Sequence, residues 1–510
     1  MTVALSAVMS SVPSADWVAL APVAIPVVAM LLVLVLEVPL AKGALRRVAD
    51  LVVLVALLGA GYAVLWLALN DNNRHTLCVG GSDTVLPSCS FVVSPLTLTL
   101  QAIVVVGAIG CVLLTLDGPA AVDRAPHHAL VLAAVAGALA LAGARDLPTL
   151  VVAFETASLP AIGLVALRRD AEGAQAGFTF LITALASLGM LVLGVSLIYF
   201  ATGQMHFDRI AVVLSPAMSS HLDSKVALVA GLGTVLALSG ILFKMSAVPF
   251  HLWTPDTYAG APMPIAAFLA VVSKAAGLAA LVVLLGVGLA PMVSTWGPVI
   301  AVIAVFTVTI GNLVALRQTV AIRLLAWSTV AQAGWVLLPL GAARGLATTR
   351  QAVSSSVAYL VAYAVASLVV FTVVVLVARH HPAGEEHTLD AYRGLGRREP
   401  VAAAAMGLGL ASLAGLPPGI MGLVAKVLVV RPLVAGQWWL LAAVAAVNVA
   451  LGLVYYLRWG ALLVAPSTGE VPTWKVRPAE GIVLGGAVAL TIAVSVYPQM
   501  LAGLLPGSLF

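Results

Sequence analysis

Long apolar stretches separated by short polar segments dominate the chain, and this pattern predicts membrane-spanning helices. A helix needs roughly 20 mainly apolar residues to cross the hydrocarbon core of a bilayer. The stretches that qualify are 17–37, 51–70, 91–116, 128–144, 147–167, 176–202, 226–250, 263–288, 297–316, 321–341, 352–378, 401–432, 437–465 and 479–500. None shows the period-two alternation of a membrane β-strand. The sequence therefore predicts an all-α integral membrane protein of about fourteen transmembrane helices.

Composition leads to the same conclusion. Of 510 residues, 62% are hydrophobic and only 9% are charged, with a mean hydropathy of +1.12, whereas a soluble domain carries about 25% charged residues. No polar segment is long enough for a separate domain, so we expect one polytopic domain over 1–510. Within it we expect three N-terminal helices in 1–116, five-helix units in 128–288 and 297–465, and a C-terminal helix at 479–500.

Basic residues in the loops predict the orientation. Fourteen spans place both termini on one side, and the loops of the other side carry fourteen Lys and Arg against seven. Because positive loops stay inside, both termini are expected outside. Cys78 and Cys89 share the predicted external loop 71–90, where a disulfide and two free thiols are both open alternatives. Cys111 is expected to be a small core residue.

Four charged residues fall well within the predicted spans: Glu155, Lys244, Lys274 and Lys426. Each charge near the bilayer centre costs about 2.5–3.5 kcal/mol on insertion scales. Burial favours a neutral lysine, and a nearby carboxylate favours the charged form, so such a pair can load and unload a proton. Snorkelling or a static ion pair are the alternatives. A proton relay is favoured because Lys274 lies eleven residues into its span and the other two lysines lie beside helix breakers.

Those breakers interrupt the seventh and twelfth spans. Pro249 follows Lys244 by five residues, and Pro417 and Pro418 precede Lys426. Proline removes a backbone donor, and the carbonyl groups it frees at membrane depth must be buried in protein or wetted. Interrupted helices at corresponding places in two halves indicate an ion path in transporters. The layout therefore predicts inverted repeats of helices 4–8 and 9–13, with helices 7 and 12 broken.

Redox and nucleotide chemistry are not expected on this chain. The nine His lie in loops or near span ends, where they form no facing pair for a haem, and three scattered Cys cannot ligate an iron–sulfur cluster. No P-loop or dinucleotide fingerprint occurs in the required context. We therefore expect no cofactor and no metal on this chain.

A specific motif lies in 243–277, which reads FKMSAVPFHLWTPDTYAGAPMPIAAFLAVVSKAAG and contains Pro249 and His251. It resembles the F-K-x-x-x-V-P-F-H-x-W-x-P-D-x-Y-x-G-A-P and S-K-A-A pattern of the antiporter-like membrane subunits of respiratory complex I, and most closely their N-type subunit. The M-type subunit carries Glu at the position of Lys426. The resemblance spans about 95–465, and the supporting stretches are 154–170, 315–335 and 412–426.

The resemblance implies a role for each buried charge. Glu155 is expected to bias its partner Lys244 at the break of helix seven, Lys274 to be the central relay, and Lys426 to serve the second half-channel. One position departs from the family pattern, because Gln332 stands where the family usually has His. Gln orders water through hydrogen bonds but does not titrate near neutrality, so a proton path there is expected to rest on water.

The implied function is proton translocation as a subunit of bacterial NADH-quinone oxidoreductase in the inner membrane. The resemblance places FMN, Fe–S clusters and quinone on partner subunits, and makes the M-type and K-type membrane subunits the neighbours. Two alternatives remain open from the residues. One is a stand-alone or Mrp-type cation/proton antiporter subunit, and the other is a structural membrane spacer that does not conduct.

Overall fold

The computed structural model describes residues 14–40, 46–80, 87–116, 124–168, 170–216, 224–380, 388–466 and 474–503, and nearly all of them are helical. Within these ranges, 13 helices are long and apolar enough to cross a membrane. The twelfth predicted span is not among them because it is divided into two shorter helices. The expectation of a helical membrane protein with about fourteen passes is therefore confirmed.

Most passes are continuous α-helices whose bounds lie within a few residues of the predicted ones. They are α2 (Trp17–Leu40), α3 (Arg46–Asn70), α4 (Pro95–Thr115), α5 (Arg124–Gly143), α6 (Leu147–Ala166), α7 (Ala171–Thr202), α14 (Val293–Ala315), α15 (Ala321–Gly341), α16 (Leu346–His380), α20 (Trp439–Val464) and α21 (Pro478–Val496). Shorter pieces connect or follow them: α8 (Phe207–Val213), η4 (Ala290–Met292), η5 (Leu389–Tyr392), α17 (Leu395–Arg398) and α22 (Gln499–Ala502).

The two predicted helix breaks are present. In the seventh pass, α10 (Ser224–Lys244) ends at the lysine itself, and α11 (Trp253–Gly260) resumes after an irregular segment that contains a cis Val248–Pro249 bond. In the twelfth pass, α18 (Pro400–Ala414) and α19 (Ile420–Ala435) flank a cis Pro417–Pro418 bond. The breaks are confirmed, whereas the inverted repeat and the domain boundaries stay predictions.

The eighth pass changes its helical winding twice. It begins as α12 (Met263–Phe268), continues as the π-helical turn η2 (Leu269–Ser273), returns to α-helix in α13 (Lys274–Val283) and ends in the π-helical turn η3 (Leu284–Gly288). Single π-turns inside α-helices are frequent at functional sites because they turn side chains away from the regular helical face. The first π-turn ends directly before Lys274.

The third pass corrects the predicted span 91–116. Phe91–Val93 belongs to strand β2 (Ser88–Val93), which pairs antiparallel with β1 (Arg74–Val79), so α4 begins only at Pro95 with Ser94 as its N-cap. β-branched and aromatic residues suit a strand as well as an apolar helix start, which explains the error. The hairpin carries the Cys78–Cys89 disulfide, the first of the two alternatives left open by the sequence.

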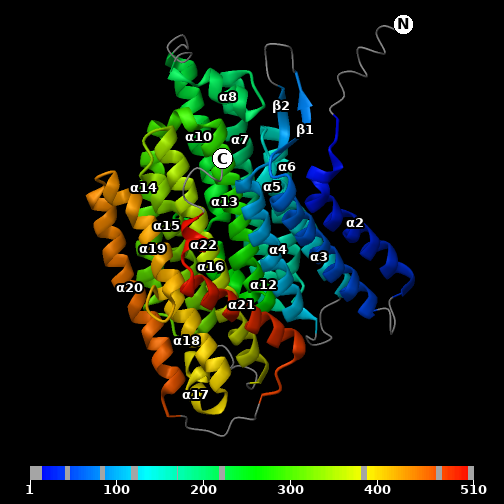
Figure 1. Ribbon diagram of the computed structural model, residues 1–510, viewed down its shortest axis with the longest axis vertical. Coiled ribbons are helices and arrows are strands. Elements are labelled where there is room, and N and C mark those ends of the chain that lie inside the picture. The colour runs from blue at the N-terminus through cyan, green and yellow to red at the C-terminus, as the bar shows by residue number, and fades with distance from the viewer. Residues whose placement is uncertain are drawn as a thin grey trace.

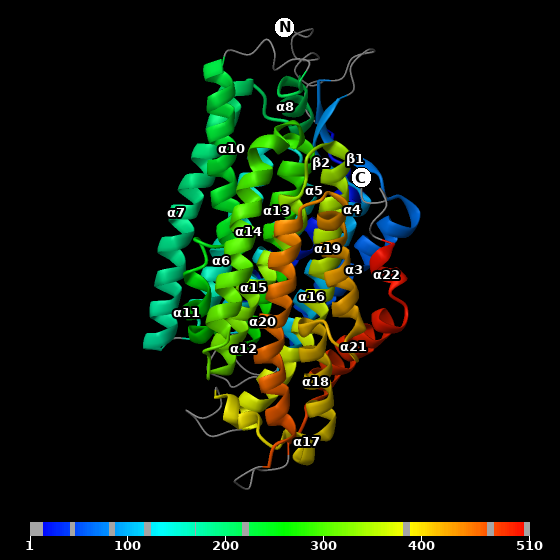
Figure 2. The same cartoon turned by 90° about the vertical axis from the view of Figure 1, so that its left-hand side faces the viewer.

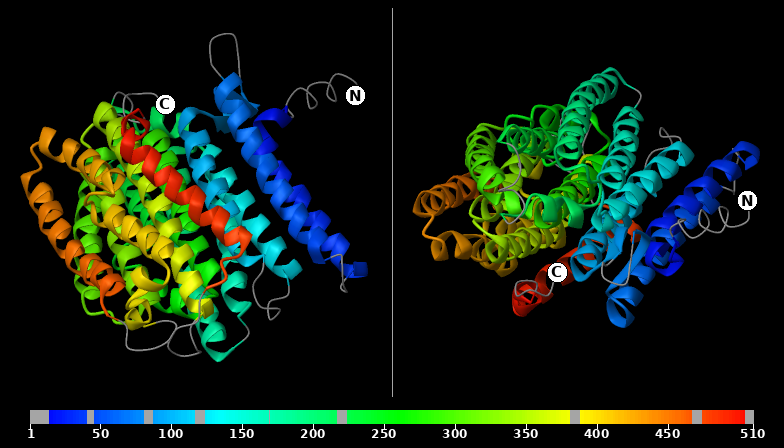
Figure 3. Two further views of the ribbon diagram at one scale, coloured as in Figure 1. Left: turned by 60° about the horizontal axis from the view of Figure 1, so that its bottom comes forward. Right: turned by 90° about the horizontal axis from the view of Figure 1, so that it is seen from above.

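The helices form one elongated bundle, with β1, β2 and α8 at one end and α17 at the other (Figure 1). Helices α2 and α3 lie at one edge and α20 at the opposite edge (Figures 1 and 3). The long α16 runs through the middle, and α21 crosses its neighbours obliquely (Figures 2 and 3). The central part of the eighth pass, from Ile265 to Gly286, is completely buried.

Outer helices expose large apolar side chains, such as Leu58, Tyr62 and Leu69 on α3 and Phe178 and Phe200 on α7. A soluble protein rarely leaves continuous apolar faces of this size exposed. In a bilayer they are matched by lipid or by other membrane subunits, while every backbone polar group of the helix is satisfied internally. The chain is a multi-pass membrane protein.

Candidate functional site

The first buried lysine lies where α10 ends. Lys244 is 3% exposed, and its Nζ donates to Ser158 Oγ on α6 at 2.8 Å. The same Nζ lies 5.3 Å from the centroid of the Phe154 ring, close enough for a cation–π contact. Both partners stand on the part of α6 that carries Glu155. The break of the seventh pass thus brings its terminal lysine against the fifth pass.

Glu155 lies beside this lysine without contacting it. The residue is partly exposed on α6, and no ion pair of 4.0 Å or less joins it to Lys244, although the two charges interact electrostatically over a longer distance. Ser158 lies one helical turn further on and donates to the Phe154 carbonyl at 2.7 Å. The hydroxyl of Ser158 therefore links the Lys244 ammonium to the backbone of α6.

Lys274 meets the same break from the other side. It is 2% exposed, and its Nζ donates to the main-chain oxygen of Lys244 at 3.4 Å and to the hydroxyl of Ser246. The Trp253 ring at the start of α11 lies 5.3 Å from this Nζ. Lys244 and Lys274 are thus connected through the backbone that the helix break exposes.

Ser246 holds this junction in an unusual backbone conformation. Its φ of +58° lies in the left-handed region, which costs a non-glycine residue about 1–3 kcal/mol and occurs preferentially at functional sites. Its buried hydroxyl accepts hydrogen bonds from Lys274 and from Thr254 Oγ1, the latter at 2.5 Å. The left-handed turn thus places the Ser246 hydroxyl within hydrogen-bonding distance of the Lys274 ammonium.

Lys426 occupies the second break. It is 6% exposed on α19, its Nζ donates to the Ala414 carbonyl at 2.5 Å, and the Trp335 ring centroid lies 5.2 Å away. Ala414 is the last residue of α18, so the ammonium binds the negative end of that helix. Gly415 follows with φ +80°, and a Cβ there would lie 2.9 Å from the Lys426 Cδ. The positive φ favours glycine, and any larger residue would displace the end of the Lys426 side chain.

The three buried lysines all bind neutral groups. Across the described residues, no Asp or Glu carboxylate lies within 4.0 Å of Lys244, Lys274 or Lys426. Each ammonium instead contacts neutral oxygens and an aromatic face. Their burial excludes snorkelling, and the absence of a bound carboxylate argues against a static ion pair.

The remaining predicted residues surround the two breaks. Pro249 is exposed in the irregular segment after α10, and the buried His251 lies edge-on to Trp327 of α15 at 5.3 Å between ring centroids. Pro417 and Pro418 are exposed between α18 and α19. The prolines thus shape the backbone at the breaks and do not line the lysine contacts.

Gln332 lies on α15 in a cluster of hydroxyl groups. Its Nε2 donates to the hydroxyl of Tyr456 at 3.0 Å and to the Leu413 carbonyl at 3.4 Å, while its Oε1 accepts from the hydroxyl of Tyr359. Ser328 lies 2.5 Å from the same Tyr456 hydroxyl. The amide therefore links α15 to α16, α18 and α20 deep within the second half of the chain.

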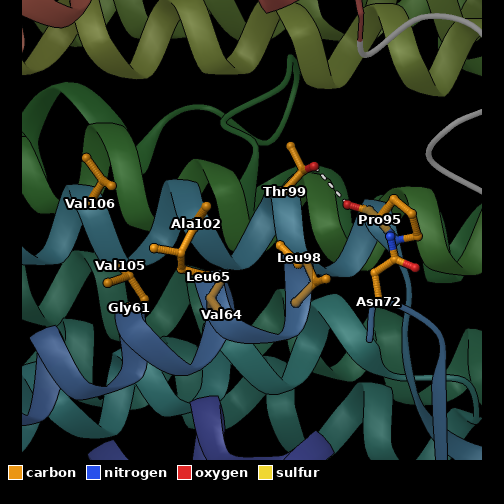
Figure 4. Close-up of a pocket in the computed structure, with 11 residues that line it drawn as sticks. Gly61, Val64, Leu65, Asn72, Pro95, Leu98, Thr99, Ala102, Val105 and Val106 are labelled. Carbon is orange, nitrogen blue, oxygen red and sulfur yellow. Dashed lines mark hydrogen bonds between the residues drawn. The ribbon is translucent and has the colours of Figure 1, made fainter. Parts of the chain in front are cut away.

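A cavity of about 370 Å³ lies away from the lysines, between α3 and α4 (Figure 4). Its lining is mainly apolar, and the Thr99 hydroxyl is already bonded to the Pro95 carbonyl at 2.8 Å. None of the four buried charges lines it. Among the described residues, no group of three or more His, Cys, Asp or Glu is arranged to hold a metal ion.

Sequence reasoning missed three hydroxyl groups that complete the lysine contacts: Ser158, Ser246 and Thr254. A signal existed for two of them. Ser158 follows Glu155 by three residues and so shares its helical face, and Ser246 follows Lys244 by two. No pattern indicated Thr254, because its contact depends on how α11 folds back after the break.

Comparison with known proteins agrees with this geometry. Residues 144–452 match the family model described as NADH:quinone oxidoreductase/Mrp antiporter, transmembrane. NADH-quinone oxidoreductase subunit N 2 of Streptomyces griseus is 43% identical over 91% of this chain and 85% of its own length. Subunit N of Salinispora tropica is 40% identical over 88% of this chain and 85% of its own length.

A solved structure gives the same assignment. One chain of respiratory complex I from Thermus thermophilus, determined with bound aureothin, superposes with a TM-score of 0.76 at 27% identity, covering 95% of this chain and 99% of that one. The resemblance expected from 243–277 is thereby confirmed. The chain belongs to the antiporter-like transmembrane family of NADH:quinone oxidoreductase and Mrp antiporters, and within it to the NADH-quinone oxidoreductase N subunits.

Proposed function

We propose that this subunit carries protons across the membrane along Glu155, Lys244, Lys274 and Lys426, driven by electron transfer in other subunits of an NADH-quinone oxidoreductase. The observation that carries the proposal is that all three lysines are buried against neutral oxygens, with no carboxylate of the described part of the chain within 4.0 Å. A cation held in this way is not locked by a counter-ion. It can lose its proton and bind it again.

The energetics favour titration over a permanent charge. Each cation near the bilayer centre costs about 2.5–3.5 kcal/mol, and a hydroxyl or carbonyl offsets only part of that cost. Lys274 Nζ donates to the main-chain carbonyl of Lys244, and the two positive charges repel each other when both are present. Loss of one proton removes the repulsion between the lysines and the burial cost of one of the two cations. The pair is therefore suited to hold one mobile proton.

Glu155 is proposed to bias this pair. Because the carboxylate interacts with Lys244 over a distance and not through an ion pair, a change in its charge or position alters the field at the lysine without breaking a strong bond. A proton displaced from Lys244 then has Lys274 as its nearest buried acceptor, reached through the Ser246 junction. Lys426 at the second break serves the other half-channel.

The supporting residues are proposed to keep the breaks open and wetted. Pro249 prevents the helix from continuing past Lys244, and Pro417 and Pro418 do the same before Lys426. His251 packs edge-on against Trp327 of α15 and so anchors the irregular segment of the first break.

Membership of the family suggests where the redox cofactors lie and which subunits are neighbours. We propose that FMN, Fe–S clusters and quinone lie on partner subunits, with M-type and K-type subunits adjacent in a bacterial inner membrane. Both termini are proposed to lie outside. The loops at the opposite end of the bundle carry more basic residues, and basic loops stay on the inner side of the membrane. The Cys78–Cys89 disulfide supports this orientation, because disulfides persist on the oxidising side.

An Mrp-type antiporter subunit is the second candidate, because the matching family model covers both classes. The 43% identity to a subunit N favours the oxidoreductase. Purification through a tag on this chain distinguishes the two. Flavin and Fe–S absorbance in the purified complex supports the oxidoreductase, and their absence from an intact assembly supports the antiporter.

The relay is tested with Lys244→Met in inverted membrane vesicles, with assembly of the complex checked first. NADH-driven quinone reduction and proton uptake are measured together. Lys225→Met is the matched control, because Lys225 stands on the same helix α10 but is exposed at its other end. We expect both activities to fall in Lys244→Met and to persist in the control. Wild-type levels of both in Lys244→Met would make Lys244 structural and favour the spacer.

A further inference from the structure

We propose that a single water molecule, held by Ser412 and Gln332, carries the proton that Lys426 exchanges with the interior of the second half of the chain. The inference rests on the proton-translocating function proposed above and assigns Ser412 a positioning role in it. Ser412 lies on α18, three residues before Gly415, and is 3% exposed. Neither residue type nor spacing had singled it out.

A cavity of about 10 Å³ lies between α15, α16, α18 and α19. A void of roughly this size accommodates one water molecule, provided that two to four polar groups surround it. Four polar side chains line this one, namely Gln332, Tyr359, Tyr363 and Ser412. The cavity therefore has both the size and the lining of a one-water site.

The hydroxyl group of Ser412 is a second, independent indication of a bound water. Ser412 lines the cavity, and its buried Oγ has no hydrogen-bond partner among the described residues. A buried hydroxyl without a partner loses about 1–3 kcal/mol of hydration, so such groups almost always bind protein or ordered water. The other polar side chains that line the cavity bind elsewhere, because Gln332 binds Tyr456 and Tyr359, and Tyr363 donates to Thr329. A water molecule is the partner that fits.

The position of the cavity connects it to Lys426. Leu413 and Ala425 line it, and these residues are the sequence neighbours of Ala414 and Lys426, whose carbonyl and ammonium bond at 2.5 Å. The Trp335 ring beneath the ammonium stacks on Tyr359, with 6.0 Å between ring centroids. The water site and the lysine thus belong to one packed cluster at the second break.

The chemistry divides the roles within this cluster. A water molecule accepts a proton on a lone pair while an opposite O–H bond releases one, so one O–H bond forms, one breaks and the water is regenerated. The amide of Gln332 does not titrate near neutrality, and so it orients the water and the tyrosine hydroxyls. In this arrangement a bound water takes the place of the titrating histidine that the family usually has at the position of Gln332.

The site is tested in the purified, reconstituted complex by two variants that act differently. Ser412→Ala removes one water ligand and keeps the space, whereas Ala362→Val fills the cavity from α16. Ser354→Ala is the matched control, since it also removes a buried hydroxyl without a partner but does not line this cavity. Lys426→Met reports on the path as a whole.

We expect proton transport per NADH oxidised to fall about tenfold in Ser412→Ala, the factor that ~1.4 kcal/mol represents in a rate. Proton transport should fall at least as far in Ala362→Val, and it should equal that of the wild type in Ser354→Ala. Wild-type transport in both cavity variants, with transport lost in Lys426→Met, overturns the water site and leaves the relay standing. Wild-type transport in Lys426→Met overturns the relay and the water site with it.

A high-resolution map of the complex gives a readout that a purely structural role would not change. We expect density for one water between Ser412 Oγ and the Gln332 amide in the wild type, and none in Ala362→Val. A well-ordered wild-type map with no density there overturns the proposal.

Discussion

Gly415→Ala is expected to disable the second break while the complex still assembles. Gly415 has φ +80°, a left-handed conformation that costs an L-residue about 1–2 kcal/mol. The added Cβ would lie 2.9 Å from Lys426 Cδ and 3.4 Å from its Nζ. Carbon atoms pack optimally at about 3.5–4.0 Å, so the lysine chain must move by roughly half an ångström or more.

That movement acts on the bond that holds the ammonium. Lys426 Nζ donates to the Ala414 carbonyl at 2.5 Å, and a hydrogen bond to a charged group contributes about 1.5–3 kcal/mol. Weakening it by half changes a proton-transfer step by about three- to tenfold, since 1.36 kcal/mol is tenfold in rate. We therefore expect Gly415→Ala to lower the melting temperature modestly and to slow proton transport more than NADH oxidation.

The assay compares Gly415→Ala with Gly407→Ala in reconstituted complex, measuring NADH oxidation, proton uptake and thermal unfolding on the same preparation. Gly407 stands on the same helix α18, and a Cβ there meets nothing within 4 Å. Its replacement removes about 1 kcal/mol of unfavourable helix propensity and should leave transport unchanged. If Gly415→Ala transports protons and melts like Gly407→Ala, the reasoning about the Lys426 pocket is refuted.

Three further outcomes are expected. Ser158→Ala removes the hydroxyl that binds Lys244 and should cost about 1.5–3 kcal/mol of stability with slower transport, whereas Ser158→Thr should retain most of both; equal losses in the two would refute a hydrogen-bonding role. Glu480→Gln removes the buried carboxylate that pairs with the partly buried Arg379 of α16 and should destabilise the fold by about 1.5–3 kcal/mol, measured by thermal unfolding, and an unchanged melting temperature would contradict it. Alkylation before reduction should leave Cys78 and Cys89 unmodified in mass spectrometry, and their modification at this stage would show free thiols.

Much of the fold could be predicted because membrane spans are set by local composition. The hydrophobic length of a helix and the cost of an isolated charge depend on a stretch of about 20 residues, and both can be read without knowing what packs against it. This explains why the bounds of α15 and the end of α7 match the expectation. It also explains the error at 91–93, where an apolar β-branched run fits a strand and a helix equally well.

The four charged residues within the spans could be predicted for the same reason, but the hydrogen-bond partners of the three lysines could not. Lys244 and Ser158 are separated by 86 positions, and Lys274 reaches Lys244 across 30. Nothing local in the sequence specifies such pairs, because they depend on which helices cross at which depth. It was equally impossible to foresee that, among the described residues, no carboxylate lies within 4.0 Å of the three ammonium groups, which supports a relay over a static ion pair.

The sequence by itself determined that this protein spans a membrane many times, that two of its helices are interrupted beside lysines, and which family it resembles. The tertiary structure alone decided that those interruptions expose backbone oxygens to the lysines, that Ser246 turns left-handed to meet Lys274, and that Ser412 faces a cavity without a partner. The physical reason is one of range. Hydrophobicity and helix breaking act through adjacent residues, whereas a hydrogen bond needs two groups placed within about 3 Å by the packing of the whole bundle.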